Sequence, residues 1–84
     1  MYTLEIKKEA YRSLAKLPKN YYVAIRDAID NLANEPHPHG SIKLKGYNDL
    51  FRIRIGMYRV IYSVENDVLV IQVIAIGHRK DIYK

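Results

Sequence analysis

The chain has 84 residues and no cysteine, and 49% of its residues are hydrophobic and 27% charged. This length is that of one small domain, so we expect residues 1–84 to form a single domain, and the composition excludes a disordered tail, a collagen and a disulfide-bonded scaffold. Residues 42–84 carry eight Lys or Arg against four Asp or Glu, most of the formal net charge of +5, and such an excess indicates either a surface for polyanions or a merely basic soluble protein.

The chain begins with a predicted strand followed by a helix. Residues 3–7 alternate polar and apolar side chains, as a half-buried strand does. From Lys8 the period becomes helical, and Pro18 ends or punctuates this helix. Apolar side chains of the helical stretch recur at spacings of three and four on one face: Ala10, Leu14 and Leu17.

A second helix follows almost at once, with Asn20 as a possible cap and Glu35–Pro36 as the stop. Its apolar stripe consists of Tyr22, Ile25, Ala28, Ile29, Leu32 and Ala33. Because the connection between the two helices is so short, the pattern predicts an antiparallel helical hairpin.

The second half predicts three strands after a loop at residues 35–41. Residues 50–55 and 58–64 alternate, and Gly56–Met57 turns the chain between them. Residues 65–67 form a second predicted turn. Residues 68–76 are apolar except for Gln72, as expected of a strand near the middle of a sheet. These connections predict an antiparallel meander over residues 50–76.

The predicted fold is therefore α+β, with an N-terminal strand, a helical hairpin and a three-stranded meander. One helical hairpin covers only one face of a small sheet. If the apolar side chains of the meander face the helices, alternation places Arg52, Arg54 and Arg59 on the open face.

Four short stretches add a family resemblance: Lys43-Leu-Lys-Gly46, Phe51-Arg-Ile-Arg-Ile55, Tyr58-Arg-Val-Ile-Tyr62 and Gly77-His-Arg-Lys-Asp-Ile-Tyr83. Each is weak alone, but their order and spacing together, along with the order of the elements, resemble RelE-type toxins of the RelE/ParE superfamily over nearly the whole chain. The resemblance implies the toxin of a type II toxin–antitoxin system, an mRNA interferase that cleaves messenger RNA in the ribosome without a metal or other cofactor. It also implies a cognate antitoxin in a hetero-oligomeric complex, and functional positions at Lys45, Arg52, Arg54, Arg59, Arg79 and Tyr83.

The chemistry of these residue types fits metal-free RNA cleavage. The 2′-hydroxyl attacks the neighbouring phosphate, so the protein must move two protons and stabilise an anionic phosphorane. Arg59, mounted on a strand, is the candidate for a bidentate phosphate contact. Arg79 could hold phosphate or assist the leaving 5′-oxygen, and Tyr83 could stack on a base or reach the 2′-oxygen with its hydroxyl.

The general base is left open among three residues. Well-known ribonuclease members of the family carry lysines where this chain has Arg52 and Arg54, and a guanidinium cannot readily accept a proton, so these arginines are interpreted as clamps on the RNA backbone. Lys45, Tyr83 and His78 remain, and only histidine ordinarily titrates near neutral pH. His78 could instead position or stack beside Arg79. The residues assigned to RNA binding are Lys43, Arg52, Arg54, Lys80 and Lys84.

Less specific interpretations compete with each of these assignments. Alternating arginines on a strand are often only solubilising. We interpret seven tyrosines as residues of the core or its boundary: Tyr2, Tyr11, Tyr21, Tyr22, Tyr47, Tyr58 and Tyr62. The pair His37 and His39 resembles part of a metal site, but a plain surface loop is the preferred interpretation.

Two further functions stay open at this point. A ParE-like toxin that poisons DNA gyrase shares the fold but lacks the catalytic cluster, and the presence of Arg59, Arg79 and Tyr83 favours the nuclease. A catalytically degenerate member would only bind its antitoxin. No apolar run approaches the roughly 20 residues of a membrane span, and the first residues lack the layout of a signal peptide, so we expect a cytoplasmic protein without membrane contact.

Overall fold

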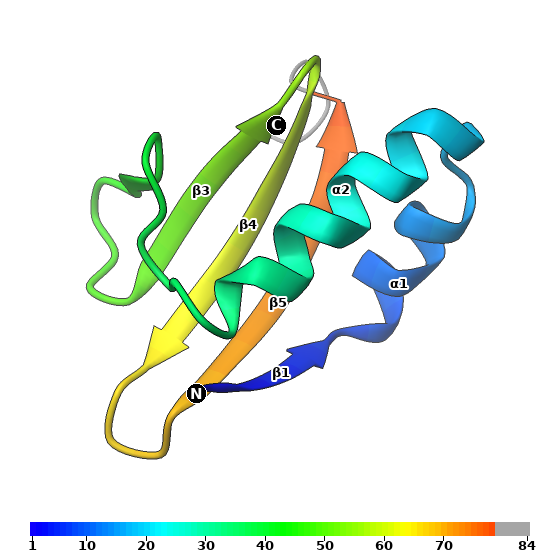
Figure 1. Cartoon of the computed structure of the whole chain (residues 1–84). Coiled ribbons are helices and arrows are strands. Elements are labelled where there is room, and N and C mark those ends of the chain that lie inside the picture. The colour runs from blue at the N-terminus through cyan, green and yellow to red at the C-terminus, as the bar shows by residue number, and fades with distance from the viewer. Residues whose placement is uncertain (79–84) are drawn as a thin grey trace.

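Two helices pack on one face of a five-stranded sheet in the computed structural model, which describes residues 1–78 (Figure 1). The elements in chain order are β1 (Thr3–Ile6), α1 (Lys8–Ala15), α2 (Lys19–Leu32), β2 (Ile42–Lys43), β3 (Leu50–Ile55), β4 (Tyr58–Glu65) and β5 (Val70–His78). The strand order is β1-β5-β4-β3-β2, with β1 parallel to β5 and the other neighbours antiparallel. The predicted α+β fold, with a helical hairpin on one face of an antiparallel meander, is confirmed.

The helical hairpin differs from the prediction in its boundaries. The first helix ends at Ala15, and α2 begins at Lys19 with Pro18 as its N-cap, so Asn20 is not the cap. Pro18 has an extended backbone with φ near −55°, and its carbonyl accepts the first helical hydrogen bond from Tyr22 N at 2.8 Å. Proline fixes φ and lacks an N–H, which suits it to this boundary.

The strand β5 lies inside the sheet between β1 and β4, as its apolar run predicts, but it begins at Val70 instead of Val68. Val68 and Leu69 belong to the turn after β4, and Leu69 has a positive φ of 54°. Both side chains are exposed. The apolar run continues through the turn, so hydropathy could not locate the start of the strand.

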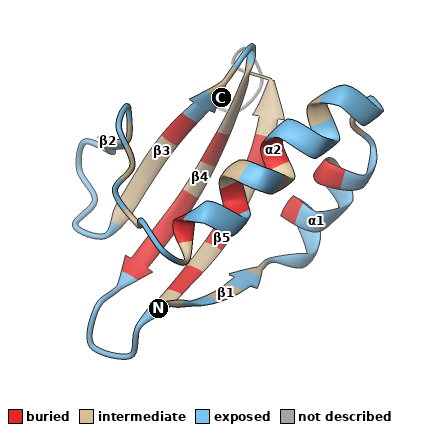
Figure 2. Ribbon diagram, viewed as in Figure 1, coloured by how far each residue is buried: buried red, intermediate tan, exposed pale blue. Residues whose placement is uncertain are grey.

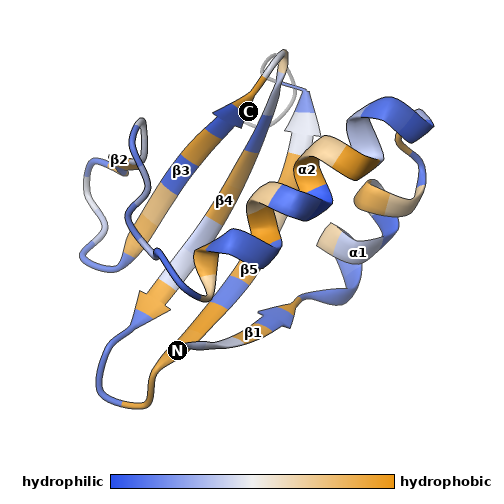
Figure 3. Ribbon diagram, in the orientation of Figure 1, coloured by the Kyte–Doolittle hydropathy of each residue, from blue (hydrophilic) through white to orange (hydrophobic). Residues whose placement is uncertain are grey.

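The hydrophobic core fills the space between the sheet and the two helices (Figure 2). Its buried residues are Ala10, Leu14, Ile25, Ile29, Leu32, Ile53, Val60, Tyr62, Val64, Ile71, Val73 and Ile76. Each large apolar side chain buried in this way stabilises the fold by roughly 1.5–3 kcal/mol. Figure 3 shows hydrophilic and hydrophobic residues alternating along β3, the pattern of a strand that has one covered and one open face.

Some aromatic residues assigned to the core lie elsewhere. Tyr11 is 55% and Tyr47 57% exposed. Tyr21, and not Tyr22, faces the sheet, and its ring lies 4.9 Å from that of Tyr58. The buried stripe of α2 therefore continues from Tyr21 through Ile25 at a spacing of four. No helix among residues 1–78 is long and apolar enough to cross a bilayer.

Candidate functional site

Three arginines share the face of the sheet that the helices leave open. In the pairing of β3 with β4, Arg54 is directly opposite Arg59 and Arg52 is opposite Ile61. Directly paired residues of antiparallel strands point to the same side of a sheet. Arg54 is exposed, whereas Arg52 and Arg59 are half-buried, and the Nε atom of Arg59 is shielded from solvent. The alternation of the sequence predicted this placement.

The direct pairing of Arg54 with Arg59 favours an anion on the open face. Like charges directly opposite each other on neighbouring strands destabilise a sheet. A phosphate bound between such cations relieves their repulsion and accepts charge-assisted hydrogen bonds from both guanidinium groups. A cross-strand arginine pair is therefore suited to a polyanion.

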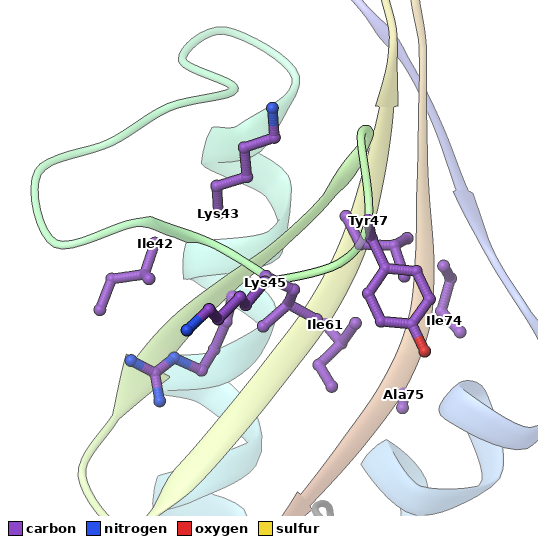
Figure 4. Close-up of a pocket in the computed structure, with 10 residues that line it drawn as sticks. Ile42, Lys43, Lys45, Tyr47, Ile61, Ile74 and Ala75 are labelled. Atoms are coloured by element: carbon purple, nitrogen blue, oxygen red, sulfur yellow. The ribbon is translucent and has the colours of Figure 1, made fainter.

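A groove of about 710 Å³ adjoins the arginines on the same face (Figure 4). Ile61, Ile74 and Ala75 form its apolar floor, and Lys45 and Arg52 are among its lining residues. The register of β4 and β5 shifts between Ile61 and the next residue, so that Ile61 pairs with Ala75 and Ile74 is the extra residue of a bulge. Bulges re-aim side chains, and this one brings the consecutive residues Ile74 and Ala75 to the same face of the sheet.

The wall of the groove is a folded loop between β2 and β3. Tyr47 N donates to Leu44 O at 3.3 Å, and Gly46 at the third position of this turn has φ of 86°. A positive φ at that position defines a type II turn and favours glycine. Leu44 N also donates to Leu50 O at 2.9 Å, which closes the loop. The turn thereby places Lys45 and Tyr47 at the groove.

The strand β2 and the segment before it are held to the core by Tyr62. Its hydroxyl donates to Pro36 O at 2.8 Å. Burial raises the pKa of Tyr62 above its usual value, and a hydrogen bond with Ser41 opposes this rise. The buried phenol therefore stays neutral and fixes the segment that leads into β2, a strand that sequence periodicity did not predict because it has only two residues.

Two predicted site residues point to the other side of the sheet. Lys43 pairs with Phe51 of the core side, and Figure 4 shows its side chain directed away from Lys45 and Ile61. His78 pairs with Tyr58, and the two rings meet edge-on at 5.9 Å. The structure therefore groups Lys45 with the three arginines and places His78 apart from them. Lys43 borders the groove, but its side chain is directed away from Lys45 and Ile61.

Four predicted site residues lie outside the described residues: Arg79, Lys80, Tyr83 and Lys84. Residues 1–78 contain no group of three or more side chains suited to a metal ion. His37, one of the two loop histidines, packs edge-on against Phe51 with ring centroids 4.7 Å apart.

The groove adds Tyr47, Ile61 and Ile74 to the candidate site, and sequence reasoning missed all three. The alternation of β4 could have identified Ile61, because it lies two residues from Arg59 and therefore on the same face of the strand. Tyr47 follows the glycine of a Lys-Gly turn, but nothing local shows that this turn folds back over the sheet. Ile74 lies in a strand that is apolar on both faces, so its sequence gives no sign of which face it occupies.

A family model described as the ParE toxin of the type II toxin–antitoxin system parDE matches residues 4–83. Curated relatives include the putative toxin RelE1 of Methanocaldococcus jannaschii, which is 31% identical over 86 residues that cover 99% of this chain and 96% of the relative. Toxin RelG of Mycobacterium tuberculosis is 30% identical, and the match covers 99% of this chain and 97% of that toxin.

Solved structures give the same result. The RelE–RelB complex of Pyrococcus horikoshii OT3 contains a chain that is 38% identical, with a TM-score of 0.84 and coverage of 95% of this chain and 97% of that one. The isolated RelE toxin of Escherichia coli, at 24% identity and a TM-score of 0.82, shares the fold and covers 99% of this chain and 92% of that one. The fold, the family model and the similar proteins together identify the chain as a toxin of a type II toxin–antitoxin system. The chain belongs to the RelE/ParE superfamily and, within it, to the RelE-type toxins.

Proposed function

We propose that this toxin is a ribosome-dependent endoribonuclease that cleaves messenger RNA without a metal ion. The observation that carries the proposal is the cluster of Arg52, Arg54 and Arg59 on the open face, beside a groove that also presents Lys45. Arginine forks on rigid strands are suited to hold phosphate oxygens in a defined geometry. This concave basic face is where the message would bind.

The proposed reaction uses the nucleophile of the substrate itself. The 2′-oxygen attacks the adjacent phosphorus while a base takes its proton. The bond between phosphorus and the 5′-oxygen then breaks, and that oxygen leaves with a proton from an acid. The products are a 2′,3′-cyclic phosphate and a 5′-hydroxyl end. Arg59, half-buried on β4, is placed to stabilise the phosphorane, which is more negative than the diester.

Lys45, His78 and Tyr83 are the candidates for the proton transfers. Lys45 lines the groove together with Arg52, so it has direct access to RNA bound on this face. His78 packs on Tyr58, which supports a positioning role for its ring. Arg79 and Tyr83 keep the roles that the family resemblance suggests, namely phosphate contact and base stacking.

The proposed partners are an antitoxin, the ribosome and its message, all in the cytoplasm. The structures similar to this chain include RelE–RelB complexes from Pyrococcus horikoshii and Methanococcus jannaschii, which supports a hetero-oligomeric complex here. The ribosome would orient the message, because one small domain offers few contacts to do so alone.

The end groups of the cleaved message test the reaction. We expect the purified toxin to cut ribosome-bound messenger RNA and to leave a 2′,3′-cyclic phosphate and a 5′-hydroxyl. A message with a single 2′-deoxynucleotide at the cleavage site should resist, because it lacks the attacking oxygen. Cleavage of that message at the same site would contradict the mechanism.

A ParE-like gyrase poison is the second candidate, and the description of the matching family model favours it. Pulse labelling after induction in bacteria separates the two functions. Loss of amino-acid incorporation before loss of thymidine incorporation supports the nuclease, whereas the reverse order supports the gyrase poison. A toxin that affects neither process but still binds its antitoxin would be a degenerate member.

A further inference from the structure

The groove on the open face has room for a nucleobase together with its sugar and phosphate, and it has an apolar floor. Its volume of about 710 Å³ is within the range of small-molecule sites. We propose that Tyr47 stacks on one base of the bound message and so forms a base subsite beside the arginine cluster. This inference rests on the proposed function and adds a residue to it.

The position of Tyr47 suits stacking. Figure 4 shows its ring at the groove, next to Ile74 and Ala75 and facing the space beside Ile61. Tyr47 is 57% exposed, so its side chain is accessible to a base. The type II turn at Gly46 holds the backbone of Tyr47, so little conformational entropy is lost when a base binds.

The positive charge of the groove favours a nucleotide, which carries an anionic phosphate, over an uncharged apolar ligand. Of its ten lining residues, all in the described part of the chain, three are cationic and none is acidic. Bases commonly insert between an aromatic ring and aliphatic side chains while cations hold the phosphate. A base between Tyr47 and the floor at Ile61 would leave its phosphate near Lys45 and Arg52.

Single-turnover cleavage of ribosome-bound message tests the subsite, with the toxin in excess over the message but below its saturating concentration. Stacking is sequence-tolerant and needs only a ring, so Tyr47→Phe should retain nearly full activity. The cleavage rate of Tyr47→Leu should be about 5- to 150-fold lower, the usual effect of removing one stacking residue. Tyr11→Leu is the matched control, because Tyr11 is equally exposed at 55% but lies on α1, and it should cleave like the wild type.

Messages with one abasic nucleotide separate stacking from a structural role of Tyr47. At the position that stacks, the missing base should slow the wild type and leave Tyr47→Leu with no further loss. If the loss in Tyr47→Leu persists on every abasic message, or if Tyr47→Leu cleaves normally, the subsite is overturned while the nuclease function stands. If Tyr47→Leu cleaves normally but no longer binds the antitoxin, the groove receives protein instead, which also overturns it. A wild type that cuts no message overturns both proposals.

Discussion

Arg59 is the most firmly mounted cation of the open face, because it is half-buried on a strand that has a partner on each side. We predict that Arg59→Ala lowers the single-turnover rate on ribosome-bound message by about 10²–10³-fold, the usual loss for one fixed transition-state donor. Arg59→Lys keeps the charge but not the fork, so it should recover only part of this loss.

The matched control for this prediction is Arg12→Ala on α1, an exposed arginine on the other side of the molecule. It changes the net charge by the same amount. Equal losses for Arg12→Ala and Arg59→Ala would mean that only the overall charge matters, and would contradict a specific role for Arg59.

Tyr62 connects the stability of the fold to pH. The unfolded chain ionises this phenol near pH 10, whereas burial raises its pKa in the folded state, so the free energy of unfolding falls as pH rises above about 10. Tyr62→Phe removes the hydrogen bond to Pro36 O, so its free energy of unfolding at pH 7 should be lower by about 0.5–1.5 kcal/mol. The variant should also show a shallower decline above pH 10.

Urea unfolding at a series of pH values measures both effects. Tyr11→Phe on the solvent side of α1 serves as the control, and we expect it to follow the wild type at pH 7. If the free energy of unfolding falls equally steeply above pH 10 in the wild type and in Tyr62→Phe, another group causes the pH dependence.

The turn between β2 and β3 is the element that brings Lys45 and Tyr47 to the groove. We predict that Gly46→Ala destabilises this turn by about 1–2 kcal/mol, because an alanine at a φ of 86° is strained. No atom lies within 4 Å of the added Cβ, so the cost is conformational and not steric. Cleavage should fall as Lys45 and Tyr47 leave the groove.

Gly40→Ala is a closely matched control, because Gly40 has a φ of 91° and equally open surroundings. It should lose similar stability in thermal unfolding but less activity. It lines a separate cavity beside Arg52 and Arg54, and it does not hold Lys45 and Tyr47 at the groove. If both variants lose activity in proportion to stability, the turn has no specific role in the site.

Sequence periodicity predicted the elements whose faces differ in polarity. The arginines of β3 alternate with core residues such as Ile53, and this alone located the open face. Periodicity could not place the start of β5, where Leu69 is apolar but lies in a turn. Nor could it find the groove, because Tyr47 reaches it through a long-range loop closure and Ala75 through a bulge.

At the scale of the whole molecule, an excess of positive charge would attract RNA to the surface without orienting it. We predict that the free toxin cleaves purified message poorly, even though the net charge of +5 promotes binding. Orientation of the reacting groups contributes much of the rate acceleration in such reactions, and the ribosome would provide this orientation.

Parallel cleavage reactions with and without ribosomes, at physiological salt, measure this difference. The same RNA, toxin concentration and reaction time are used in both. Rapid cutting of purified message would show that the protein alone orders the nucleotide, and the proposed dependence on the ribosome would then be wrong.

The strand order has a consequence for how the toxin is made. The first strand, β1, pairs with β5, the last strand of the sheet to be synthesised, and α1 also packs on β5. Until Val70–His78 has emerged, the nascent chain therefore lacks an interior strand of its sheet, and β1 has no strand to pair with. Folding must wait for a contact between distant parts of the chain, which delays it. The groove, whose floor includes Ile74 and Ala75 of β5, is thus not complete until this strand has been synthesised.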